Sequence, residues 1–165
     1  MPSPSAAWTG SVPDWSPGDT ITETLMDDIS SKLMFLKNRT YDVVTVATTT
    51  TTSATFVAMT GASITLTNTS GGRVVIWFNA TVTNSGVQNV FLDFGIDGTR
   101  QGDTTNGLGY IGISTGSLRQ MATLWFLTDT APSAGSHTYA VYWKTSGGTA
   151  TIDATNCQFG VMDFA

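Results

Sequence analysis

From Thr55 onward, the sequence is a series of short stretches in which every second residue is apolar, separated by turn-forming residues. A period of two places alternate side chains on one face of a β-strand. Clusters of Asn, Gly, Ser and Pro separate the stretches, as turns would. Many short strands at this spacing favour a β-sandwich or jelly roll over residues 55–165. The expected strands lie near residues 55–59, 63–67, 73–83, 88–97, 109–114, 119–128, 137–145, 149–153 and 157–164, with a further short one at 41–47.

Three segments of different composition precede this region. Residues 1–19 hold four of the five prolines, which predicts an extended arm without a core of its own. Residues 20–39 read as one short helix, because Thr20 and Glu23 form a capping box ahead of an apolar stripe. Residues 40–54 include a run of threonines and are expected to be a spacer or a strand edge.

The arm and the helix are the predicted means of attachment. Two tryptophans on an extended arm need a surface to pack on, and Trp is enriched at the energetic centres of interfaces. That surface is another subunit or protein, or else the sandwich of the same chain. The helical stripe is too short for a stable coiled coil, so copies of itself, the β-domain or a partner protein must bury it. The predicted attachment residues are Trp8, Trp15, Met26, Ile29, Leu33 and Leu36.

The predicted strand at residues 73–83 is apolar on both of its sides. Alternate residues from Val74 to Val82 occupy one side, and Val75 and Trp77 begin the other. A strand with one face in water should alternate apolar with polar residues. The predicted strands at 119–128 and 137–145 repeat the pattern, so one sheet face should fill the core and the other should meet a neighbouring subunit. The predicted trimer interface consists of Val75, Trp77, Leu124, Phe126 and Tyr142.

The low charge of the chain agrees with covered surfaces. Lys, Arg, Asp and Glu make up 12% of the residues, against roughly 25% in typical soluble domains. Either the chain has a Thr-rich polar face with few charges, or sister subunits cover part of its surface; the doubly apolar strands favour the second. The net charge is -5 with no basic patch, so nucleic acid is not an expected partner. No stretch is long and apolar enough to predict a membrane span, and the N-terminus does not resemble a signal peptide.

Two catalytic patterns match by letter only. Residues 112–116 fit G-x-S-x-G around Ser114, but a strand is expected to follow and the single histidine is His137. Residues 107–112 fit G-x-G-x-x-G without the βαβ unit that binds a dinucleotide. We therefore expect no enzyme activity and no cofactor. A hydrolase built around Ser114 is the rival hypothesis.

Metal chemistry is not expected either. The single cysteine, Cys157, is predicted to be a small buried apolar residue. Asp93, Asp97 and Asp103 lack the spacing of a calcium loop and are expected to be solvated turn residues. His137 is expected to make a hydrogen bond at a strand start.

Two parts of the sequence resemble structural proteins of tailed bacteriophages. The run Trp15-Ser-Pro-Gly-Asp-Thr-Ile-Thr, followed by Leu25, Asp28 and Leu36, resembles the N-terminal segment of many such virion proteins. The C-terminal stretches 132–139, 147–152 and 158–164 are similar to phage fibre and head-protein knobs with a tumour-necrosis-factor-like jelly roll.

The resemblance implies a homotrimer on the surface of the virion, without enzyme activity. Its partner would be the major capsid protein or a tail protein of the same particle. Because no long shaft separates the predicted anchor from the knob, we expect a capsid decoration protein or head fibre. The alternative is a receptor-binding tail fibre whose knob contacts the host cell surface through an exposed aromatic residue such as Tyr110.

Overall fold

The computed structural model describes residues 40–68, 72–114, 118–128 and 130–164. The predicted arm and helix, residues 1–39, lie outside these ranges. Within the described ranges the chain is mainly β and forms no helix. The strands are β1 (Tyr41–Thr45), β2 (Thr49–Thr51), β3 (Val57–Asn68), β4 (Val74–Asn84), β5 (Asn89–Ile96), β6 (Thr99–Arg100), β7 (Gly109–Gly112), β8 (Gln120–Leu127), β9 (Gly135–Thr145) and β10 (Ala150–Asp163).

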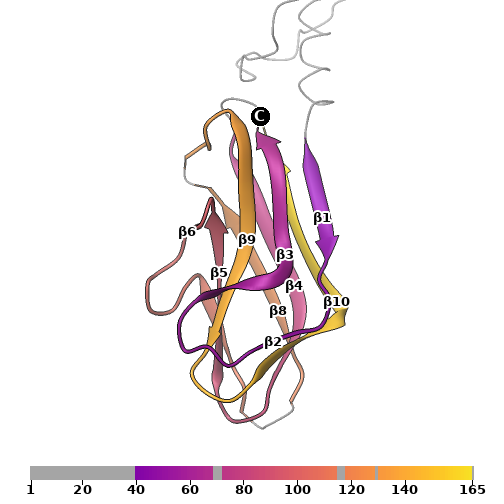
Figure 1. The fold of residues 1–165 in the computed structure, drawn as a ribbon, viewed down its shortest axis with the longest axis vertical. Helices are drawn as coiled ribbons and strands as arrows, with labels where there is room; N and C mark the ends of the chain where they lie inside the picture. The colour runs from indigo at the N-terminus through magenta and orange to yellow at the C-terminus, as the bar shows by residue number, and fades with distance from the viewer. Residues whose placement is uncertain (1–39, 69–71, 115–117, 129, 165) are drawn as a thin grey trace, which may run out of the picture.

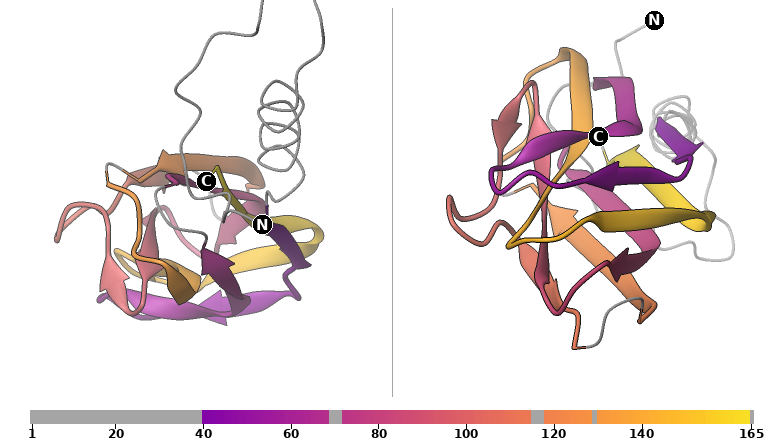
Figure 2. Two further views of the ribbon diagram at one scale, coloured as in Figure 1. Left: turned by 90° about the horizontal axis from the view of Figure 1, so that it is seen from above. Right: turned by 60° about the horizontal axis from the view of Figure 1, so that its bottom comes forward.

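The strands form two antiparallel sheets that pack face to face (Figures 1 and 2). One sheet has the order β1-β10-β4-β8, with β2 beside β10, and is called the β4 sheet below. The other has the order β3-β9-β5-β6, with β7 beside β5, and is called the β5 sheet. The prediction of a mainly β chain arranged as a sandwich is confirmed.

Strand pairing is nested along the chain. The first strand, β1, pairs with the last, β10; β3 pairs with β9, β4 with β8, and β5 with β7. Such nesting brings the start and the end of the described chain together: the N–H of Asp163 donates to the carbonyl of Thr40 at 2.9 Å. Both therefore lie at one end of the sandwich, the upper end in Figure 1.

The core lies between the two sheets. Every second residue of β4 is buried, and so are alternate residues of β9 from Tyr139 onward. Across the sheets the rings of Phe94 and Phe159 lie 6.1 Å apart. Burial of apolar surface, worth about 25 cal/mol per Å², is what holds the sheets together. The larger buried side chains are Ile76, Phe78, Phe94, Ile113, Tyr139, Trp143, Ile152 and Phe159.

Two pairs of expected strands are continuous in the structure. The stretches 55–59 and 63–67 belong to β3, whose register shifts between Ala58 and Ser63, near Gly61 with its φ of +79°. The stretches 149–153 and 157–164 belong to β10, whose register shifts between Asp153 and Gln158. Such irregularities insert residues without ending a strand. β1 lies within the further short strand expected at residues 41–47. β2 is made of threonines and lies in the segment expected to be a spacer or a strand edge.

Candidate functional site

The outer face of the β4 sheet is apolar at the end of the sandwich where β1 begins. Strand register places its side chains in rows that cross four strands. The first row is Tyr41, Met162, Val75 and Leu127, and the second is Val43, Gly160, Trp77 and Trp125. We call these two rows the apolar half of the face.

The next row on the same face is polar. It consists of Thr45, Gln158, Asn79 and Thr123. The face is thus divided along the strands: it is apolar where the described chain begins and ends, and beyond that it is polar except for the exposed Met121 of β8. A sheet face in contact with water is expected to be polar throughout, so the apolar half is the unusual feature of this surface.

Two tryptophans form the centre of the apolar half. Trp77 on β4 and Trp125 on β8 are directly paired, and their rings stack with centroids 5.9 Å apart and planes 21° apart. On the other side of Trp77, its ring covers Gly160 of β10, where a Cβ would overlap the indole carbons. The side chain of Trp125 is 63% exposed in the single chain. A large exposed apolar patch of this kind typically marks an interaction site.

The structure separates the five residues predicted to form the trimer interface. Val75 and Trp77 lie on the outer face of the β4 sheet, within the apolar half. Leu124 and Phe126 lie on its inner face, where they pair with Phe78 and Ile76 and pack against the core. Tyr142 belongs to the outer face of the other sheet, where its ring covers Gly95.

Other exposed residues on β8 and β1 were missed by the sequence analysis. Trp125 and Leu127 occupy the apolar half next to Trp77 and Val75. Tyr41, 67% exposed, and Val43 extend it at the opposite edge of the sheet. A short strand was expected at residues 41–47, but its pairing with the C-terminal strand could not be predicted from the sequence. The predicted attachment residues of the arm and helix lie outside the described residues.

Asp93 is not a solvated turn residue, contrary to the expectation from sequence. It lies within β5 on the outer face of the β5 sheet and is fully buried. Its Oδ2 forms a salt bridge with Nη1 of Arg100 at 3.0 Å. The backbone N–H groups of Phe94 and Gly102 donate to its other oxygen, both at 2.8 Å. Burial raises the pKa of the Asp93 carboxyl, while these N–H groups and Arg100 act in the opposite direction. The group anchors the segment after β6 to the sheet.

Cations and aromatic rings alternate beside Asp93. The guanidinium carbon of Arg100 lies 4.0 Å from the centroid of the Phe56 ring. The Nζ of Lys144 lies 4.8 Å from the same ring and 4.9 Å from the ring of Phe91. Phe91 in turn contacts Tyr110, which is 63% exposed. This cation–aromatic ladder, Arg100, Phe56, Lys144, Phe91 and Tyr110, is a second surface with aromatic character.

Ser114 does not carry the features of a nucleophile in the described structure. The G-x-G-x-x-G run contains β7, and the next element among the described residues is the strand β8, whereas either motif would be followed by a helix. The serine that contacts His137 is Ser133, whose Oγ lies 3.3 Å from Nε2. The carbonyl oxygen of Ser133 lies closer to Nε2, at 2.9 Å, and Nδ1 lies 2.6 Å from a carboxylate oxygen of Asp97. A carbonyl can only accept, so this arrangement favours a proton on Nε2 and does not prepare the ring to take one from Ser133.

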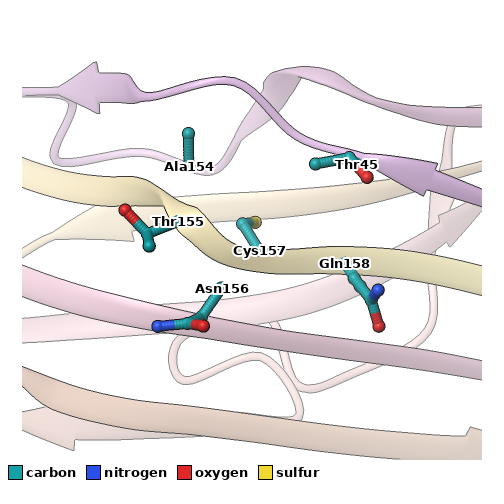
Figure 3. A pocket seen from close by; sticks show the side chains of 6 residues that line it. All are labelled: Thr45, Ala154, Thr155, Asn156, Cys157 and Gln158. Carbon is teal, nitrogen blue, oxygen red and sulfur yellow. The ribbon is translucent and has the colours of Figure 1, made fainter.

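Cys157 lies beside the irregularity in β10, at a shallow polar pocket (Figure 3). Its side chain is 1% exposed. Burial raises the pKa of the thiol to about 11, so the nucleophilic thiolate is scarce at neutral pH. The prediction of a buried apolar cysteine is confirmed. The pocket is lined by Thr45, Ala154, Thr155, Asn156, Cys157 and Gln158.

The described ranges contain no cluster of three or more His, Cys, Asp or Glu side chains that could bind a metal ion. These ranges also contain no helix that could cross a lipid bilayer. In comparisons with known proteins, no protein-family model matches the chain, and no curated protein matches it in sequence.

Proposed function

We propose that this chain is a non-enzymatic structural component of a bacteriophage particle, a homotrimeric capsid decoration protein or head fibre. The observation that carries the proposal is the apolar half of the β4 sheet's outer face. In a single copy it leaves Trp125 63% exposed beside the half-buried Trp77. Apolar area of this kind gains about 25 cal/mol per Å² when a partner covers it.

The neighbour that covers this face is a second copy of the chain, and threefold symmetry follows from the resemblance to trimeric phage knobs. The interface then contains Val75 and Trp77 together with Trp125 and Leu127 of β8. Leu124 and Phe126 stay in the core of each subunit, where they pack in the single chain. Tyr142 on the β5 sheet faces away from the threefold axis.

The strand order supports a jelly roll of the tumour-necrosis-factor-like type. In a jelly roll the chain behaves as one long hairpin that is rolled into two sheets, so that first and last strands pair and the inner pairs follow in order. The nested pairs β1 with β10, β3 with β9, β4 with β8 and β5 with β7 have this form. Short β6 forms an additional hairpin with β5.

Attachment to the particle is assigned to residues 1–39. The described chain begins at Thr40, at the end of the sandwich that carries the apolar half. In a trimer packed through that half, three N-terminal segments would leave from neighbouring points. Three linked attachments gain on the order of 10²–10⁴ in avidity over one. The partner is the major capsid protein, or a tail protein, of the same particle.

The oligomeric state tests the interface. We expect the full chain to sediment as a trimer and Trp125→Glu to sediment as a folded monomer, because the charge lies at the centre of the apolar half. Ser63→Glu is the matched control, since it places the same charge on an exposed position of β3 in the other sheet. A native chain that sediments as a folded monomer at low concentration would overturn the trimer.

Particle binding tests the anchor. Labelled full-length protein is added to particles that lack it, and occupancy is compared with that of Trp8→Ala and Trp15→Ala variants. The expected result is lower occupancy of the variants on the head, located by antibody labelling. Unchanged occupancy would show that the tryptophans of the arm do not attach the protein to the particle. Labelling confined to the tail would show that it is a tail protein and not a head protein.

A receptor-binding tail fibre is the alternative, and the exposure of Tyr110 beside Phe91 and Lys144 favours it. An exposed aromatic ring next to a cation is a surface suited to recognition. In that case the full chain binds host cells and Tyr110→Ala weakens the binding. Absence of any cell binding by the native trimer would count against this alternative.

A further inference from the structure

His137 is held by oxygen acceptors at both of its ring nitrogens. Nδ1 lies 2.6 Å from Oδ2 of Asp97, in the turn between β5 and β6, and Nε2 lies 2.9 Å from the carbonyl oxygen of Ser133, just before β9. An ionised carboxylate and a backbone carbonyl can only accept hydrogen bonds, so both contacts are satisfied only when both ring nitrogens carry a proton. The geometry is therefore that of an imidazolium ion.

We propose that His137 is a pH-operated staple: its protonated ring fastens the 130–134 loop to the β5–β6 turn, and loss of the proton frees the loop. The other oxygen of Asp97 accepts the N–H of Thr138 at 2.8 Å, so the carboxylate stays in place whatever the state of the ring. The neutral ring would keep its proton toward Asp97, since charge-assisted hydrogen bonds are the stronger ones. The lone pair of Nε2 would then face the lone pairs of the Ser133 carbonyl, and the loop must move.

The loop forms part of the wall of a cleft next to the core. The cleft has a volume of about 450 Å³, and Pro132 of the loop and His137 line it together with Ile96 and Phe126, which pack against the core. Release of the loop therefore uncovers apolar side chains at this end of the sandwich. The cleft is also lined by Asp97, Gln101, Thr128 and Thr130.

Asp97 supplies the charge that acts on the ring within the described part of the chain. Tyr139, next along the same face of β9, has its ring centroid 6.5 Å from that of His137, and its pKa of about 12 keeps it neutral. The residue of β3 opposite His137 is Leu66, and β8 contributes Phe126 to the cleft. Hydrogen bonding to Asp97 and to the Ser133 carbonyl raises the pKa of His137 above 6.5.

The sign of the pH effect follows from the raised pKa. A group that binds its proton more tightly in the folded chain contributes stability that is fully present below its unfolded pKa. For His137 this contribution is lost as the pH rises through the raised value. The loop is therefore closed in mildly acidic solution and released at higher pH.

Because His137 is the single histidine, its ring can be followed without overlap by long-range ¹H–¹⁵N NMR of the full chain. We expect a pKa above 6.5, with both nitrogens protonated below it, and a loss of amide protection in the 130–134 loop as the pH rises through it. Asp97→Asn should lower the pKa toward 6.5. Ser133→Ala should leave it unchanged, because the carbonyl and not the hydroxyl is the partner.

His137→Gln should abolish the pH step in protection, since Gln does not titrate in this range. A pKa at or below 6.5, a step that persists in His137→Gln, or a lowered pKa in Ser133→Ala would each overturn the staple. Should His137→Gln fail to fold, the native titration and Asp97→Asn decide the question.

Discussion

The indole of Trp77 lies over the α-carbon of Gly160, its partner on the neighbouring strand, so closely that no side chain fits between them. Val43 follows on the far side of Gly160, and Trp125 stacks on the near side of Trp77. The glycine thus lets the Trp77 ring lie against the neighbouring strand while it stacks with Trp125. The flat apolar half depends on this one missing side chain.

Gly160→Ala should therefore destabilise the protein. The added methyl group overlaps the Trp77 ring, which must tilt outward or shift the strands, at a cost of about 1–3 kcal/mol for overpacking. Urea unfolding measures the change, and the proposed trimer should be weaker in sedimentation. Gly86→Ala is the control, because its added methyl group would meet only Gln88, at an ordinary contact distance of 3.7 Å. Equal stability of the two variants would mean that the Trp77 ring can move away from the added methyl group without cost.

Asp93→Asn should destabilise the fold although it preserves the shape of the side chain. The oxygen facing Phe94 and Gly102 can remain an acceptor, but the new NH₂ group then points at Nη1 of Arg100, donor against donor. Removing one partner of a buried ion pair costs about 3–5 kcal/mol. We expect about 3 kcal/mol, since the Arg100 side chain keeps 21% exposure.

Asp153→Asn is the comparison for this prediction. Asp153 pairs with Arg119 at 2.7 Å, but the Arg119 side chain is 70% exposed. Water and salt screen such a pair, so the variant should change the unfolding midpoint only slightly. If the two substitutions have the same effect, burial of Asp93 does not set the strength of its pair.

The sequence predicts where most of the strands lie, but not which strands pair with one another. Period two and turn residues are local, and they located β4, β5, β8 and β9 to within a few residues. The pairing of β1 with β10 joins positions more than a hundred residues apart, which no local signal encodes. The same holds for β2, whose threonines have no apolar face of their own and form a strand because β10 lies beside them.

The orientation of β8 shows why Leu124 and Phe126 were grouped with Trp77 in the predicted interface, although they face the core. Both sides of this strand are apolar at its C-terminal end, so the pattern alone does not decide whether Leu124 and Phe126 or Trp125 and Leu127 face inward. A shift of one residue exchanges the two sets. The pairing of Phe126 with the buried Ile76 decides it. In β4 the alternation continues to Val82, which is why Val75 and Trp77 were assigned to the outer side correctly.

Lys144→Met should destabilise the β5 sheet by about 1 kcal/mol, within the range of partly desolvated cation–π contacts. The variant keeps the aliphatic stem over Phe56 and Phe91 but removes the charge that contacts both rings. Lys144→Arg retains a cation and should recover most of the loss. The cation at position 144 contacts rings and not carboxylates. The difference in stability between Lys144→Met and Lys144→Arg, measured by urea unfolding, should therefore change little between low and high salt. A native-like midpoint for Lys144→Met would show that the ladder is held by apolar packing alone.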